Sequence, residues 1–241
     1  MYLLNANDPL AVFPDPEQAA SPEGIVAIGG DLNVGRLVQA YRQGIFPWYN
    51  EYEPILWWSP DPRLVLYPGQ LHVGRSLRKR LKRTAVGITF DTDFAGVIRG
   101  CAEPRGDGPE GAGTWLDPQM IQAYRRLHAH GLAHSVEAWD EAGNLVGGLY
   151  GVALGRVFFG ESMFTRVTDA SKGAFVHGVR TLADHGYRLI DCQVYSDHLA
   201  RFGAVEIPRS RFLLELDRAL AEPEPAEPWP YAKRPERPTA D

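Results

Sequence analysis

The chain has 241 residues, a formal net charge of −5, and 44% apolar residues including 11% aromatic ones. This length suits one large domain or two small ones. The acidic balance excludes nucleic-acid binding over the whole surface, so any such surface must be a local patch. Two cysteines, Cys101 and Cys192, are too few for a disulfide framework and favour a reducing compartment. With no leader and no membrane-long apolar run, we expect a soluble cytoplasmic protein.

The first 75 residues are rich in proline, glycine and tryptophan and predict a small N-terminal α/β lobe. A helix is predicted over 34–41, because its apolar residues recur at helical spacing and Gly44 stands where a C-terminal glycine belongs. The segment PILWWSPDPRLVLYP (54–68) then predicts two short strands around a turn bounded by prolines.

A basic run, GRSLRKRLKRT (74–84), breaks the acidic trend. It predicts a helix with Leu77 and Leu81 on one side and positive charge on the other. Like charges three and four residues apart repel each other, which costs stability unless a polyanion lies nearby. The run therefore favours phosphate binding slightly over an ordinary solvated helix face. The residues that share this charged side are Arg75, Arg78, Lys79, Lys82 and Arg83.

The middle of the chain predicts a loop over 103–113 and then a helix, with Asp117 as its N-cap and Pro118 at its first position. Trp48 and Trp115 lie in loops rich in proline and glycine. A tryptophan in such a loop either packs in the core or stacks on a nucleic-acid base, and the spacing leaves both open.

The rest of the chain predicts an α+β domain over 76–220. Three strands are expected within 132–164, then a helix over about 170–185, a strand over 189–194, a short helix, a turn and a last helix. Residues 221–241 hold six prolines with mixed charge, and we expect them to be disordered or draped over the surface.

Polar residues stand out in two of these strands. Glu161 is set among aromatic residues, so its carboxylate must be paired with a hydrogen-bond or charge partner, be protonated, or take part in catalysis. In LIDCQV (189–194) the strand period of two places Asp191 and Gln193 on one face and Cys192 on the other, which favours a core cysteine over a nucleophile. If Glu161 lies beside this pair, the three residues form a polar cluster with aromatic rings beneath it, as in a small-molecule site. The alternative is a polar pair at a strand end that hydrogen-bonds a loop. Gly160 beside Glu161 indicates a bulge or a close backbone approach.

Several familiar metal and catalytic motifs are absent from the sequence. It has no CxxC or HExxH for a metal, no GxSxG for an acyl-serine mechanism, and no GKS/T for a nucleotide. We therefore expect no metal and no cofactor.

The motifs GGDL, WWSPDPR, GESMF and LIDCQV occur together, in order, within residues 20–215. As a set they resemble the leucyl/phenylalanyl-tRNA–protein transferase family. The resemblance implies a soluble bacterial enzyme that moves Leu or Phe, with Met as a third candidate, from aminoacyl-tRNA to the α-amine of a protein that begins with Arg or Lys. The product is a target of N-degron proteolysis. The resemblance also implies a GNAT-like acyltransferase fold for 76–220.

The same resemblance assigns site residues. The polar reaction-centre residues are Glu161, Asp191 and Gln193, and the apolar walls around the aminoacyl side chain are Leu149, Phe158 and Ile190. The aromatic residues near the 3′ adenosine of the tRNA are Trp48, Trp115 and Tyr124, and the basic helix at 75–83 faces the tRNA. One departure is Gly178, where some members carry a bulky apolar residue. Its loss enlarges the pocket and leaves the preference among Leu, Phe and Met open.

Three alternatives share part of this pattern. A CoA-dependent N-acetyltransferase would need a glycine-rich pyrophosphate loop, whereas TRVTDASK (165–172) has no glycine. An enzyme that builds peptidoglycan bridges would share the aminoacyl-tRNA donor but not the acceptor. A non-catalytic RNA-binding module would use the basic helix and the loop tryptophans but would leave the polar cluster without a purpose.

Overall fold

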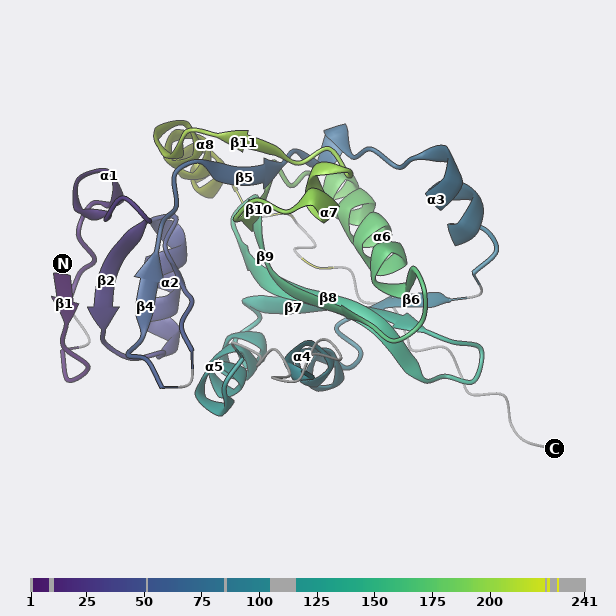
Figure 1. Ribbon diagram of the computed structural model, residues 1–241, viewed down its shortest axis with the longest axis horizontal. Helices are drawn as coiled ribbons and strands as arrows, with labels where there is room; N and C mark the ends of the chain where they lie inside the picture. The colour runs from purple at the N-terminus through teal and green to yellow at the C-terminus, as the bar shows by residue number, and fades with distance from the viewer. Residues whose placement is uncertain are drawn as a thin grey trace.

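The computed structural model describes residues 2–8, 11–50, 52–84, 86–104 and 116–223, together with Pro225 and Trp229. These residues form a four-stranded sheet and a seven-stranded sheet that lie side by side, with helices packed against both (Figure 1). The predicted α+β class is confirmed.

The smaller sheet belongs to the N-terminal part of the chain and has the strand order β1–β2–β4–β3. Helix α2 (Val34–Arg42) packs beside it, and Asn33 caps this helix by accepting a hydrogen bond from the Arg36 amide at 2.8 Å. The predicted helix over 34–41 is confirmed. The other elements are β1 (Tyr2–Leu4), α1 (Pro16–Ala19), β2 (Ile25–Gly29), β3 (Phe46–Pro47) and β4 (Leu56–Trp58).

The larger sheet has the strand order β11–β5–β10–β9–β8–β7–β6. Strands β7, β8 and β9 form the predicted antiparallel meander, and β10 pairs with β9 in parallel. The short strands β6 and β11 were not predicted. The bounds are β5 (Arg63–Leu66), β6 (Gly87–Phe90), β7 (Ala133–Trp139), β8 (Leu145–Leu154), β9 (Val157–Thr165), β10 (Leu189–Gln193) and β11 (Val205–Ile207).

The two strands predicted within 54–68 are confirmed, but they belong to different sheets. Strand β4 pairs with β2 and β3, whereas β5 lies between β10 and β11. The chain therefore passes from one sheet to the other between Trp58 and Arg63.

Helices cover both faces of the larger sheet: α4 and α5 lie on one face and α6 on the other (Figure 1). The predicted helix over 170–185 is confirmed. So is the predicted start of α5, where the Asp117 carboxylate accepts a hydrogen bond from the Met120 amide at 2.6 Å. The helices are α3 (Arg75–Leu81), α4 (Phe94–Ala102), α5 (Pro118–Ala129), α6 (Ala170–Asp184), α7 (Asp197–Ala200) and α8 (Arg209–Ala221), with a short 3₁₀ turn at Pro68–Gln70.

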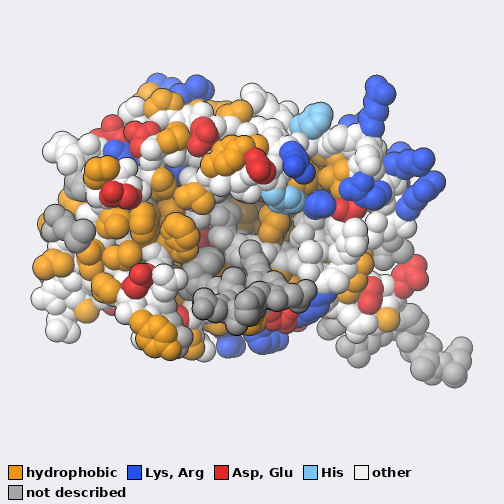
Figure 2. All heavy atoms as spheres, viewed as in Figure 1, with side chains coloured by type: hydrophobic (Ala, Val, Ile, Leu, Met, Phe, Trp, Pro, Cys, Tyr) orange, Lys and Arg blue, Asp and Glu red, His pale blue; other side chains and the backbone are white. Residues whose placement is uncertain are grey.

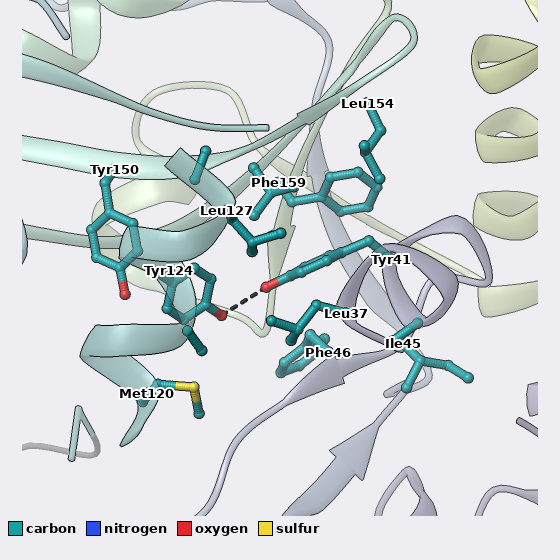
Figure 3. Packing of buried hydrophobic residues seen from close by; sticks show 14 of the residues in the cluster. Leu37, Tyr41, Ile45, Phe46, Met120, Tyr124, Leu127, Tyr150, Leu154 and Phe159 are labelled. Carbon is teal, nitrogen blue, oxygen red and sulfur yellow. Dashed lines mark hydrogen bonds between the residues drawn. The ribbon is translucent and has the colours of Figure 1, made fainter. Parts of the chain in front are cut away.

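One hydrophobic core joins the smaller sheet to the α4 and α5 face of the larger one. Figure 3 shows Tyr41 of α2 packed between Phe159 of β9 and Tyr124 of α5, with its hydroxyl directed at that of Tyr124. Helix α2, in the N-terminal part of the chain, thus places the Tyr41 side chain against the larger sheet. Tyr41, Tyr124 and Phe159 are all fully buried, so this joint is part of the core.

Two segments were predicted to be irregular: the loop over 103–113 and the proline-rich tail over 221–241. Most of each segment lies outside the described residues. Within the tail, Pro225 and Trp229 are described, and both are buried.

Candidate active site

Two β-bulges on neighbouring strands direct Glu161 and Gln193 at each other. On β9, Gly160 and Ser162 pair with consecutive residues of β8, so Glu161 is the extra residue of a bulge. On β10, the register against β5 shifts just before Gln193, whose φ of 64° lies in the left-handed region. The Gln193 amide Nε2 donates a hydrogen bond to Glu161 Oε1 at 3.0 Å. A bulge re-aims side chains in this way, and the irregularity expected at Gly160 is confirmed.

The left-handed backbone also corrects the predicted facing of Gln193. A strict period of two would place Gln193 with Asp191, but Gln193 lines the same cavity as Ile190 and Cys192, and Asp191 does not. The prediction was right for Asp191 and Cys192, which lie on opposite faces, and wrong for Gln193. The register shift breaks the strand period at this residue.

Two tyrosine hydroxyls hold the Glu161 carboxylate. Tyr41 donates to Oε1 at 2.9 Å and Tyr124 donates to Oε2 at 2.6 Å, while the two hydroxyl oxygens lie 2.7 Å apart. With Gln193, the carboxylate is thus held from α2, α5 and β10. These phenols were not predicted to contact Glu161, because α2 and α5 are far from β9 in the sequence.

Burial raises the pKa of Glu161 to about 7. The hydrogen bonds from Tyr124 and Tyr41 oppose this shift because they stabilise the ionised form. Burial also raises the pKa of both phenols well above the usual value. Near neutral pH the Glu161 carboxyl can therefore gain or lose a proton, whereas the tyrosines stay protonated and donate. A carboxyl with such a pKa beside a cavity is a candidate for proton transfer.

Asp191 is engaged in a fully buried ion pair with Arg63. The guanidinium donates Nε to Oδ1 at 2.8 Å and Nη2 to Oδ2 at 2.6 Å, and it lies 4.8 and 4.5 Å from the ring centres of Phe46 and Phe212. Asp191 Oδ1 also accepts the backbone N–H of Gln193 at 2.9 Å. Asp191 therefore acts on its surroundings through the backbone of Gln193, which it fixes in the left-handed turn.

An apolar cavity of about 860 Å³ lies beside Glu161 and Gln193, between the larger sheet and α6. Its volume is in the range of small-molecule sites. The structure brings together the three predicted wall residues, Leu149, Phe158 and Ile190, and the last two are register partners on β9 and β10. Sequence reasoning missed other apolar residues that line it: Val136, Met163, Phe175, Val179, Leu182, Cys192 and Trp229.

Gly178 of α6 also lines the cavity. A Cβ atom at this position would lie 3.2 Å from Val136 Cγ2, so a larger residue would need Val136 to shift by a few tenths of an ångström. The glycine therefore lets Val136 of β7 pack closely against α6 at the edge of the cavity.

Of the three predicted stacking aromatics, Trp48 and Tyr124 lie within the described residues. Trp48 is 42% exposed, does not line the cavity, and accepts a hydrogen bond at its carbonyl from Trp58 Nε1 at 2.5 Å. Trp115 lies outside the described residues. Tyr124 is fully buried, so its ring is not open to stacking, and its hydroxyl instead holds Glu161.

The basic residues lie on α3 and just beyond it, all exposed (Figure 2). Arg80 anchors the helix by donating to the Asp169 carboxylate at 2.5 Å, and Leu77 and Leu81 pack on the core. Arg80 lowers the pKa of Asp169. Within the described part of the chain, no ion pair engages the five predicted phosphate-binding residues, Arg75, Arg78, Lys79, Lys82 and Arg83.

A polar cluster able to exchange a proton near neutrality, at the edge of an apolar cavity, is typical of an enzyme that acts on a small molecule. Residues 65–217 match the family model described as leucyl/phenylalanyl-tRNA protein transferase, and residues 30–61 match that of its N-terminal domain. The chain belongs to this family, and the resemblance predicted from the motifs is confirmed.

Individual proteins of the family match over nearly the whole chain. The leucyl/phenylalanyl-tRNA–protein transferase of Alkalilimnicola ehrlichii is 53% identical over 232 residues, which cover 96% of this chain and 89% of that one. The Oleidesulfovibrio alaskensis protein of the same name is 57% identical over 233 residues, which cover 95% of this chain and 92% of that one.

Among solved structures, a GCN5-related N-acetyltransferase from Sphaerobacter thermophilus aligns with 78% of this chain and 59% of its own at 16% identity, with a TM-score of 0.35.

Two further findings concern the described residues alone. They contain no group of three or more His, Cys, Asp or Glu residues placed to hold a metal ion. They also contain no helix with the length and apolar character needed to cross a membrane.

Proposed function

We propose that the protein is a cytoplasmic aminoacyltransferase that moves Leu or Phe from aminoacyl-tRNA to the α-amine of proteins beginning with Arg or Lys. One observation carries this proposal. The apolar cavity, walled by Leu149, Phe158 and Ile190, ends beside the hydrogen-bonded pair of Glu161 and Gln193. An apolar side chain placed in the cavity would have its ester beside polar groups that can hold an amine.

The reaction needs no cofactor because an aminoacyl ester is already activated. The amine nitrogen attacks the ester carbonyl carbon, an N–C bond forms, and the C–O bond to the ribose of the tRNA breaks. The amine loses a proton and the departing ribose oxygen gains one. A protein α-amine has a pKa of roughly 7.7–8.0, so on the order of 10% is neutral at pH 7. A strong base is therefore not required.

Gln193 orients the attacking amine. Its amide nitrogen is engaged by Glu161, so its amide oxygen is the group left to accept an N–H from the amine. Asp191, locked by Arg63, holds the Gln193 backbone in the required turn. Holding amine and ester together lowers the barrier by up to ~7–11 kcal/mol in ideal cases.

Glu161 holds the entering N-terminus and takes its proton. An ionised carboxylate attracts the ammonium group, and a pKa of about 7 is close to that of the amine, so a proton passes between them at little cost. Tyr41 and Tyr124 fix the carboxylate in place for this step.

The cavity selects the aminoacyl side chain by shape. One methylene more or less changes the binding free energy by only ~1–3 kcal/mol, so the same cavity accepts the side chains of Leu, Phe and Met. Val and Ile do not fit because they branch at Cβ. The exposed basic residues of α3 bind tRNA phosphates, and salt weakens this contact steeply.

The start of α6 argues against the CoA-dependent alternative. In N-acetyltransferases of that type, the loop between strand and helix binds pyrophosphate. Here that place is taken by Asp169, whose carboxylate pairs with Arg80 and with Lys172 Nζ at 2.7 Å. These ion pairs already engage the two cations at this helix start, so Arg80 and Lys172 are not free to bind a pyrophosphate.

The test is transfer of labelled leucine from leucyl-tRNA to peptides that begin with Arg, Lys or Ala, with acetyl-CoA as a competing donor. The proposal expects transfer to the Arg and Lys peptides, little to the Ala peptide, and no acetylation. Binding of leucyl-tRNA without transfer would instead favour the RNA-binding module, and transfer to a muropeptide alone would favour the peptidoglycan enzyme.

A further inference from the structure

Trp229, from the proline-rich tail, is buried in the same cavity as the three predicted wall residues. Only 2% of it is exposed. Its indole stacks on Phe158 with ring centres 5.4 Å apart and on His134 at 4.5 Å, with interplanar angles of 20° and 17°. It also meets Phe90 edge-on at 5.9 Å. Such contacts place an aromatic ring specifically as well as burying it.

The rings beneath Trp229 form a fixed floor. Phe158 fills the space over Gly151 of β8, where a Cβ atom would lie only 2.5 Å from its ring. His134 lies directly across from Gly151 on β7. Its ring is held at both nitrogens, by Asp91 Oδ2 at 2.6 Å and by the Gly131 carbonyl at 3.1 Å. The indole therefore rests on a platform that cannot easily move.

The position of Trp229 closes one side of the cavity. Its ring contacts run from Phe158 of β9 to His134 of β7 and Phe90 of β6, whereas Gln193 ends β10 on the other side of β9. About 860 Å³ remains free with the indole in place, so the ring is a wall of the cavity and does not fill it. Its Nε1 has no hydrogen-bond partner among the described residues, so the ring contacts are what hold it.

We infer that Trp229 is a specificity-determining residue, whose indole forms the inner end of the aminoacyl cavity and limits the length of the side chain it accepts. This rests on the proposed function, in which that cavity takes the side chain of the transferred residue. A leucine or phenylalanine side chain that enters beside Glu161 and Gln193 extends toward the indole. Removing the indole lengthens the cavity and favours a larger side chain.

The experiment compares Trp229→Ala and Trp229→Phe with the wild-type protein in the transfer assay, using leucyl-, phenylalanyl- and tryptophanyl-tRNA. We expect Trp229→Ala to shift the ratio of kcat/KM for Phe over Leu by about tenfold toward Phe, and to admit Trp. Trp229→Phe, which keeps a smaller ring, should shift it less. The matched control is Trp139→Phe: Trp139 is also buried, but it does not line the cavity, and its Nε1 donates to Thr89 Oγ1 at 2.6 Å.

The outcomes separate this inference from the proposed function. If the wild-type protein transfers neither Leu nor Phe, the proposed function fails and the inference falls with it. If the wild-type protein transfers both but neither Trp229 variant changes the ratio, the inference alone is overturned. If circular dichroism shows that Trp229→Ala does not fold, Trp229→Phe is the deciding variant. A change in its Phe-over-Leu ratio of kcat/KM that Trp139→Phe does not show supports the inference. An unchanged ratio overturns it.

Discussion

Replacing Glu161 by glutamine should change how the stability of the protein depends on pH. The pKa of Glu161 is about 7 in the folded protein, against 4.5 for an ordinary glutamate. Because this pKa is raised, the carboxyl contributes stability that is fully present below pH 4.5 and is lost as the pH rises through 7. A rise in the pKa from 4.5 to about 7 corresponds to roughly 3 kcal/mol. Since Glu161 retains some exposure, we expect about 2–3 kcal/mol. Glutamine cannot ionise, so the variant does not suffer this loss.

The measurement is urea unfolding of the wild-type protein and Glu161→Gln at pH 4.5 and pH 8. Between these values, the free energy of unfolding of the variant should rise by about 2–3 kcal/mol relative to the wild type. Glu141→Gln, at an exposed turn between β7 and β8, is the control and should follow the wild type at both pH values. A constant difference between wild type and Glu161→Gln across this range would refute the argument that burial raises this pKa.

Three other changes test separate parts of the site. Tyr124→Phe removes a donor to Glu161 and should lower the free energy of unfolding at pH 8 by about 1–3 kcal/mol in urea titrations; no loss would contradict the hydrogen bond. Asp191→Ala leaves Arg63 buried without its partner and should cost about 3–5 kcal/mol, whereas the double variant Arg63→Met, Asp191→Leu should recover much of it; equal losses would contradict the buried pair. Glutamine at three basic residues of α3 should reduce the slope of log affinity for leucyl-tRNA against log salt by about 2, and an unchanged slope would remove α3 from the tRNA surface. The three residues are Arg75, Arg78 and Lys79.

Local sequence signals predicted the elements that depend on local physics. The helices α2, α3 and α5 follow from apolar spacing, capping residues and a proline at the first position. The meander follows from alternating strands and turns. The motifs led to the family, and through it to Leu149, Phe158 and Ile190, which the fold brings into one cavity.

The parts that were missed depend on partners far away in the sequence. The turn that redirects Gln193 is fixed by Asp191 and Arg63, which are 128 positions apart, and the Tyr41 hydroxyl meets Glu161 across 120 positions. No local periodicity carries such information. The tail was predicted from its prolines and mixed charge, whereas the burial of Trp229 depends on rings supplied by three strands of the larger sheet.

The central claim is that Gln193 holds the attacking amine beside an ester whose side chain fills the cavity. The most direct measurement is single-turnover transfer of leucine from bound leucyl-tRNA to an Arg-initiated peptide, comparing wild type, Gln193→Ala and the exposed control Gln122→Ala. The account predicts that Gln193→Ala loses about a hundredfold in the transfer rate at unchanged affinity for leucyl-tRNA, while the control keeps the wild-type rate. A Gln193→Ala variant that transfers leucine as fast as the wild type would contradict it.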